Sequence, residues 1–182
     1  QHKLLHLDQA MPTLKEMSKQ QYQRFYDITG KLIVADQAVD LFEWVVHRVI
    51  TQELYAHFVK PFRGSGRITR ASRVHKPVSL VLSLLAAVGS TSDDQRRLAY
   101  QRGVALWGGK PSMTQLEYFD YQTLNQALDR LRDLNADLTQ RFIDACAGVV
   151  NADGELTGDE FALIKGVATT LGCPLPPLEP ST

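Results

Sequence analysis

The sequence predicts an all-α fold of about seven helices, and two observations carry this prediction. Apolar residues recur at intervals of three to four positions along most of the chain. The chain also repeats itself: residues 23–50 align without a gap on residues 140–167, and 7 of the 28 positions are identical, against about two expected by chance. Each copy has an apolar-periodic segment, an Ala-Asp turn and a second periodic segment, so we expect two helical hairpins related by internal duplication.

The helices can be placed in order from the periodicity and from the residues that interrupt it. The first hairpin is expected over residues 18–58 and the second over residues 135–172, with the connecting helices between residues 77 and 134. The individual helices of the first hairpin and of the connection are expected at 18–35, 40–58, 77–88, 93–106 and 121–134.

The whole of residues 1–178 is expected to form a single domain, because 182 residues are enough for one sizeable core. Residues 173–182 are rich in proline and are expected to be an extended tail. Residues 59–76 lose the helical period and are expected to form a loop or a short hairpin.

The composition is that of an ordinary soluble globular protein, with 44% hydrophobic residues and a net charge of zero. No overall basic excess points to nucleic acid, and we expect none as a partner. The longest apolar run, residues 78–88, is too short for the roughly 20 residues that cross a bilayer. The first twelve residues lack a signal-peptide core, which favours the cytoplasm, and Cys146 and Cys173 are expected to be reduced thiols.

The second turn, NADGELTGDE, invites a comparison with the calcium loop of EF-hands. Asn151, Asp153, Gly154 and Glu160 suit loop positions 3, 5, 6 and 12. Position 1 needs a carboxylate but is Val149, and the first copy fits less well. The sequence therefore argues against calcium binding of the EF-hand type.

A structural interpretation accounts for the same acidic residues without a metal. Thr157 and Glu160 have the spacing of a capping box, and residues 40–43 are its counterpart in the first copy. Asp36 and Asp153 would accept hydrogen bonds from the amides of the turns that follow them. A second interpretation stays open, in which a pseudo-twofold brings the carboxylates together as a divalent-cation site. The candidate metal ligands are Asp36, Glu43, Asp153 and Glu160.

One segment concentrates positive charge in an otherwise neutral chain. Between residues 60 and 76 there are six Lys or Arg residues and one histidine, and no acid. Such a segment can bind an anionic membrane surface, an acidic partner or nucleic acid, or it can be a solvated loop. The residues expected to bind an anionic surface are Arg63, Arg67, Arg70, Arg73 and Lys76.

No arrangement of residues in the chain points to catalysis, so we expect it not to be an enzyme. The chain has no H-E-x-x-H motif, and His47 and His57 lie ten positions apart, off any shared helical face. The sequence around Ser65, Gly-Ser-Gly, lacks the preceding strand that a nucleophile elbow or a phosphate loop requires.

The stretch ADGELTGDEFALIKGVA, residues 152–168, resembles the signature of TerB-like helical domains, in which an Ala-Asp-Gly turn and a glutamate lie between two helices. Gln37 stands where this signature has glycine in the first copy. The closing LGCPLPPL of residues 171–178 makes the chain similar to the C-terminal cytoplasmic region of bacterial membrane-bound zinc metallopeptidases of the CAAX-protease-like class. The resemblance covers about residues 18–178 and implies two TerB-like hairpins.

The resemblance also implies a function. The chain would be a non-catalytic accessory, regulatory or protein-interaction domain of a membrane-bound zinc metallopeptidase, whose active site would lie upstream. Its partner would be another protein or the membrane-embedded peptidase domain of the same polypeptide, with an anionic membrane surface as a further partner. It would lie at the cytoplasmic face of the inner membrane, with the present fragment itself soluble. We expect no required cofactor; the alternative is a divalent-cation sensor that uses the acidic turns.

Overall fold

The computed structural model describes residues 2–35, 41–60, 64–109, 113–116, 120–175 and 178. Within these residues it contains eight α-helices, one short 3-10 helix and no strand beyond one isolated bridge, which confirms the all-α class. None of the described helices combines the length and the apolar character needed to cross a bilayer. The chain forms two compact units, residues 1–63 and 64–182. The single domain expected over residues 1–178 stays a prediction.

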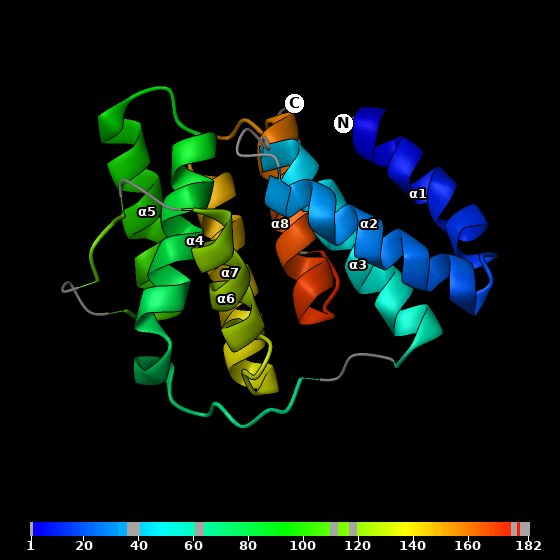
Figure 1. The fold of residues 1–182 in the computed structure, drawn as a ribbon. Helices are drawn as coiled ribbons and strands as arrows, with labels where there is room; N and C mark the ends of the chain where they lie inside the picture. Colours follow the sequence, from blue (N-terminus) through cyan, green and yellow to red (C-terminus); the bar gives the residue numbers. More distant parts are fainter. Residues whose placement is uncertain are drawn as a thin grey trace. The chain divides into compact units, whose positions relative to one another are not determined.

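The first unit consists of α1 (His2–Lys15), α2 (Lys19–Ala35) and α3 (Leu41–Phe58), with α3 packed against both others (Figure 1). Two of the helices match the expected hairpin. The helix α1 was not predicted, because Pro12 interrupts its pattern. It is held by its buried apolar side chains and by an ion pair of 2.8 Å between Lys15 Nζ and Glu53 Oε2.

The second unit is built around α4 (His75–Val88), which is buried along nearly its whole length and contacts each of the other four helices of the unit. Its sequence is almost continuously apolar, which is typical of a helix surrounded by others. The surrounding helices are α5 (Asp93–Trp107), α6 (Tyr121–Leu131), α7 (Ala136–Val150) and α8 (Gly158–Leu171).

The closest packing in the second unit is between α5 and α7. A Cβ atom on Gly103 of α5 would collide with Val149, and one on Gly148 of α7 would collide with Leu106. The two glycines therefore let the backbones of these helices approach each other. The apolar face of α7 formed by Leu138, Phe142, Ala145 and Val149 is buried.

Local caps begin and end these helices. Gly172 ends α8 in the left-handed conformation, with φ of 67°. The helix α6 stops at Leu131 and not at residue 134, because Leu134 forms an isolated bridge with Ile68. Four side chains accept a hydrogen bond from a backbone amide in the first turn of the helix that follows: Ser92 for α5, Asp120 for α6, Asn135 for α7 and Thr157 for α8.

The two hairpins share several positions. The starts of α2 and α3 lie 117 residues before the starts of α7 and α8. The Gln23 amide donates to the Asp27 carboxylate at 3.2 Å, and Gln140 donates to Asp144 at 2.8 Å in the same register. These features support the predicted duplication, which remains a proposal.

Candidate functional site

The acidic turn of the second unit joins α7 to α8. Asp153 Oδ1 accepts a hydrogen bond from the amide of Glu155 at 3.0 Å, and Gly154 has a φ of 78°. This is the expected turn, in which a short acidic side chain bonds the backbone two residues on and a glycine takes the left-handed conformation.

Glu160 completes the predicted capping box at the start of α8. Its Oε2 accepts from the backbone amide of Thr157 at 2.9 Å and from the Thr157 hydroxyl at 2.8 Å. In return, the Thr157 Oγ1 accepts from the Glu160 amide at 3.2 Å. The prediction of a structural role for this glutamate is confirmed.

The environment of Glu160 is unusual for a capping residue, because its side chain is only 2% exposed. Its Oε1 lies against Gly89, where any Cβ atom would collide with the carboxylate. Burial raises the pKa of Glu160 above its ordinary value of 4.5, and the charge of Asp153 adds to this, while the bonds from Thr157 lower it. The carboxylate is thus hydrogen-bonded at the start of α8 and packs against the residue that follows α4.

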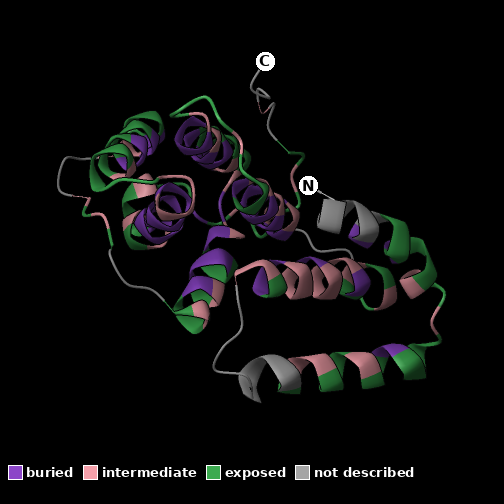
Figure 2. Ribbon diagram, turned by 90° about the horizontal axis from the view of Figure 1, so that it is seen from above, coloured by how far each residue is buried: buried purple, intermediate pink, exposed green. Residues whose placement is uncertain are grey.

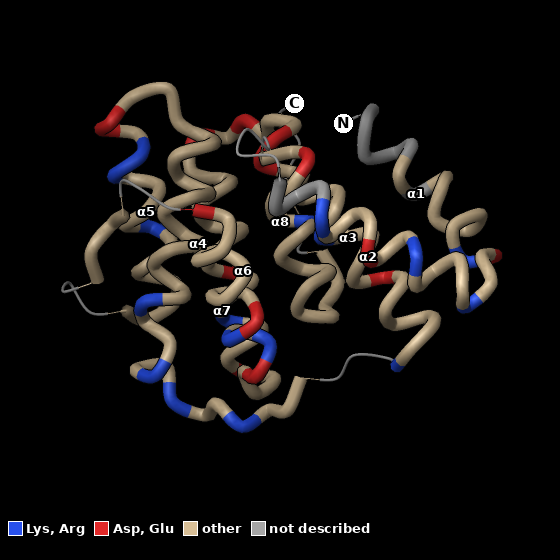
Figure 3. Tube along the Cα trace, viewed as in Figure 1, with Lys and Arg blue, Asp and Glu red and all other residues tan. Residues whose placement is uncertain are grey.

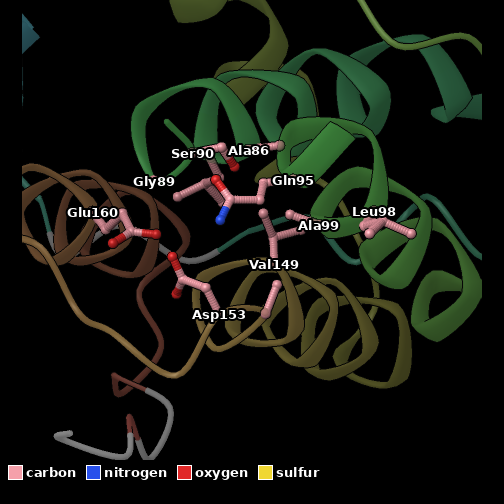
Figure 4. Close-up of a pocket in the computed structure, with 11 residues that line it drawn as sticks. Ala86, Gly89, Ser90, Gln95, Leu98, Ala99, Val149, Asp153 and Glu160 are labelled. Carbon is pink, nitrogen blue, oxygen red and sulfur yellow. The ribbon is translucent and has the colours of Figure 1, made fainter. Parts of the chain in front are cut away.

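Asp153 and Glu160 line one cavity of about 340 Å³, together with Ser90 from the connection between α4 and α5 and Gln95 from the first turn of α5 (Figure 4). Two carboxylates and two neutral polar side chains are groups that hard divalent cations accept as ligands. Among the described residues, however, no three or more His, Cys, Asp or Glu side chains converge as a metal site would require. Ser90, Gln95 and Gly89 were missed in the sequence because they lie far from the turn along the chain.

The other two predicted metal ligands belong to the first unit of the chain. Glu43 lies in the first turn of α3, in the first unit, and is exposed. Asp36 lies outside the described residues. The structure therefore brings together Asp153 and Glu160, and the four-carboxylate site stays a prediction.

The predicted basic residues lie on the segment that leads into α4, which Figure 3 shows as a series of blue bands. Arg63 lies outside the described residues. The remaining four side chains are exposed, and none of them takes part in an ion pair with another described residue. We call these four residues the basic strip: Arg67, Arg70, Arg73 and Lys76.

The turn between α6 and α7 holds the basic strip in place. The backbone amide of Ile68 donates to the carbonyl of Asp133 at 2.9 Å, and the amide of Asn135 donates to the carbonyl of Ile68 at 3.0 Å. The Ser65 hydroxyl donates to Asp133 Oδ1 and lowers the pKa of that carboxyl. Of the strip, Arg67 and Arg70 lie in the non-helical residues 64–70, Arg73 lies in the short 3-10 helix Ala71–Arg73 and Lys76 lies in α4; the alternative of a short hairpin is wrong for the described part of residues 59–76.

A further difference between the hairpins concerns the exposure of corresponding residues. In α2, Tyr26 is 45% and Ile28 is 58% exposed, whereas their counterparts in α7, Ile143 and Ala145, are 2% and 0% exposed. Figure 2 shows α2 as mostly pink and green. The helix α5 covers α7, and the corresponding face of α2 is open.

The titratable groups in the described residues offer no activated nucleophile. Burial raises the pKa of the Cys146 thiol, and burial also raises the pKa of the Cys173 thiol. Burial, and then the charge of Arg48, lower the pKa of His47. Both cysteines are free, as predicted.

A scan against protein-family models, a search of curated proteins and a search of solved structures each find no match to this chain. The TerB-like resemblance and the link to a membrane peptidase therefore stay expectations from the sequence.

Proposed function

We propose that this chain is a non-catalytic accessory domain, which binds a helix of a protein partner on the open face of α2. The observation that carries this proposal is the contrast between Ile28, which is 58% exposed, and its counterpart Ala145, which is fully buried. Burying one large apolar side chain contributes about 1.5–3 kcal/mol, so covering Ile28 would be a substantial gain.

The charges on α2 indicate what kind of helix would bind. Lys19, Arg24 and Lys31 are exposed on α2 and outnumber the one acid, Asp27. The partner is therefore an amphipathic helix with an apolar stripe and an acidic flank. Following the resemblance, we propose that it belongs to the upstream peptidase domain, at the cytoplasmic face of the inner membrane.

A photo-cross-linking amino acid at position 28, in the full polypeptide that carries the upstream domain, tests this proposal. The matched control is position 98, because Leu98 is also an apolar and 62% exposed helical residue. We expect position 28 to cross-link to an amphipathic helix outside this chain and position 98 not to do so. Cross-links from position 28 that all end within this chain would refute the proposal.

A second candidate function is binding to an anionic membrane surface through the basic strip. Its four exposed cations support this function, because clustered Lys and Arg contribute about 1 kcal/mol each near an anionic bilayer. The test is sedimentation with vesicles that contain anionic phospholipid. Binding that is unchanged after alanine replaces Arg67, Arg70 and Arg73 would exclude it.

The alternative of a divalent-cation sensor rests on the shared cavity of Asp153 and Glu160. Its test is the thermal unfolding midpoint in EDTA and in Ca²⁺, Mg²⁺, Mn²⁺ and Zn²⁺. A native-state ligand at 100 times its dissociation constant adds about 2.7 kcal/mol of stability. A metal-specific rise that is lost in an Asp153→Ala/Glu160→Ala variant would establish the sensor.

A further inference from the structure

A second cavity, of about 640 Å³, opens in the second unit between the first turns of α4 and α6. Residues 113–116 form its third wall. Its volume falls within the range of about 300–1,000 Å³ that is typical of small-molecule sites. The proposed function uses α2 of the first unit, so this cavity is independent of it.

The wall formed by residues 113–116 is fastened to α4 by side-chain hydrogen bonds. The Ser79 hydroxyl donates to the carbonyl of Thr114 at 2.6 Å, and the amide of Leu116 donates to Ser83 Oγ at 2.9 Å. Ser79 is also bonded to the Tyr100 hydroxyl at 2.6 Å. Residues 113–116 of this wall are thus anchored to α4.

The floor of the cavity is apolar. Leu80 of α4 and Ala127 of α6 are buried, and Met113 and Leu116 add further apolar surface from the connecting wall. A small polar ion alone would leave this surface uncovered, whereas a hydrocarbon chain would cover it.

The mouth of the cavity is cationic. Lys76 lines it and is exposed, and Arg73 of the basic strip lies three residues before it, at the end of the short 3-10 helix Ala71–Arg73. His75 also lines it.

No acid is among the described residues that line the cavity. Among the described residues, the charge of Lys76 therefore has no opposite charge in the lining of the cavity.

We infer that this cavity binds an amphiphile with an anionic head and a hydrocarbon tail. The head lies between His75 and Lys76, and the tail lies over Leu80, Ala127 and Met113. Free fatty acids and the anionic lipids of a membrane share this chemistry.

Calorimetric titration of the full chain with dodecanoate tests the inference, with dodecanol as the uncharged match. We expect one molecule of dodecanoate to bind, and dodecanol to bind about tenfold more weakly, because it lacks the charge. Absence of dodecanoate binding, or equal affinity for the two compounds, would overturn the inference.

Two variants locate the binding. Lys76→Glu reverses the charge at the mouth and should weaken dodecanoate binding about tenfold. It should not unfold the chain, because an acid in the first turn of a helix is favourable. The matched control is Lys31→Glu, an exposed lysine of α2, which should leave the affinity unchanged. Equal affinity of the two lysine variants for dodecanoate would refute the location.

Ala127→Leu fills the floor of the cavity and should abolish dodecanoate binding in the folded variant.

Displacement of bound dodecanoate distinguishes the two ligand sources. Vesicles of phosphatidylglycerol that displace it would identify a membrane lipid as the ligand. Vesicles that leave it bound would identify a free fatty acid. Both results support the inference, whereas displacement that is equal in the parent and in the Lys76→Glu variant would place the lipid contact elsewhere.

Discussion

Replacing Glu160 by alanine and by glutamine separates its capping role from the cost of burying its charge. Alanine removes the two bonds that Oε2 accepts from Thr157, at 2.9 and 2.8 Å. Hydrogen bonds to a charged group contribute about 1.5–3 kcal/mol, and a helix cap contributes about 1 kcal/mol. Part of this gain is offset because burial disfavours the carboxylate. We expect Glu160→Ala to lower the free energy of unfolding by about 1–2 kcal/mol at pH 7.

Glutamine suits the same position of a capping box, since its carbonyl oxygen accepts the same amide without a charge. Glu160→Gln should therefore stay within about 0.5 kcal/mol of the parent at pH 7. The parent and the Glu160→Gln variant should differ in how their free energies of unfolding depend on pH. The native pKa of Glu160 lies above its ordinary value of 4.5, so the folded parent binds more protons than the unfolded chain in this interval. The stability of the parent relative to the glutamine variant should fall as the pH rises from 4.5 through the native pKa.

The assay is urea unfolding followed by circular dichroism at several pH values, with linear extrapolation to water. The matched control is Asp159→Asn, which removes an exposed acid from the same helical turn and should cost only about 0.5 kcal/mol. The reasoning fails if glutamine destabilises the chain as much as alanine. It also fails if the stability difference rises with pH, because that sign would mean a lowered pKa.

Two further predictions concern glycines and thiols. Gly30→Ala should stabilise the chain by about 0.5–1 kcal/mol, because nothing lies within 4 Å of the added methyl group, whereas Gly103→Ala should destabilise it by about 1–3 kcal/mol, because that methyl collides with Val149. Urea unfolding would contradict these two predictions if both substitutions changed the free energy of unfolding in the same direction. Burial and the raised pKa predict that Cys146 does not react with an aromatic disulfide reagent in the native chain at pH 8, while half-buried Cys173 reacts slowly. Rapid reaction of two thiols before unfolding would show that the core around α7 opens readily.

Most helix starts and ends could be predicted from the sequence, because their signals are local. The side chains of Ser92, Asn135 and Thr157 each accept a hydrogen bond from the backbone amide three residues ahead. Gly172 takes the left-handed conformation directly after the last residue of α8. The capping role of Glu160 was predictable for the same reason. The α1 helix was missed because Pro12 weakens its local pattern, and packing on α3 outweighs that weakness.

Contacts between residues far apart in the sequence could not be predicted in this way. Ile68 bridges to Leu134, and Glu160 lies against Gly89. Neither contact has a local signal, since each depends on which elements become neighbours when the core forms. The same holds for the cavity between α4 and α6, whose walls come from three separate segments.

The sequence by itself determined the helical class and several of the helix caps, because periodicity and capping act within a few residues. Only the tertiary structure decided that two similar hairpins have different surroundings. The face of α7 is buried beneath α5, while Ile28 on α2 stays exposed. Burial depends on what packs against a helix, and the helix's own residues do not encode that partner.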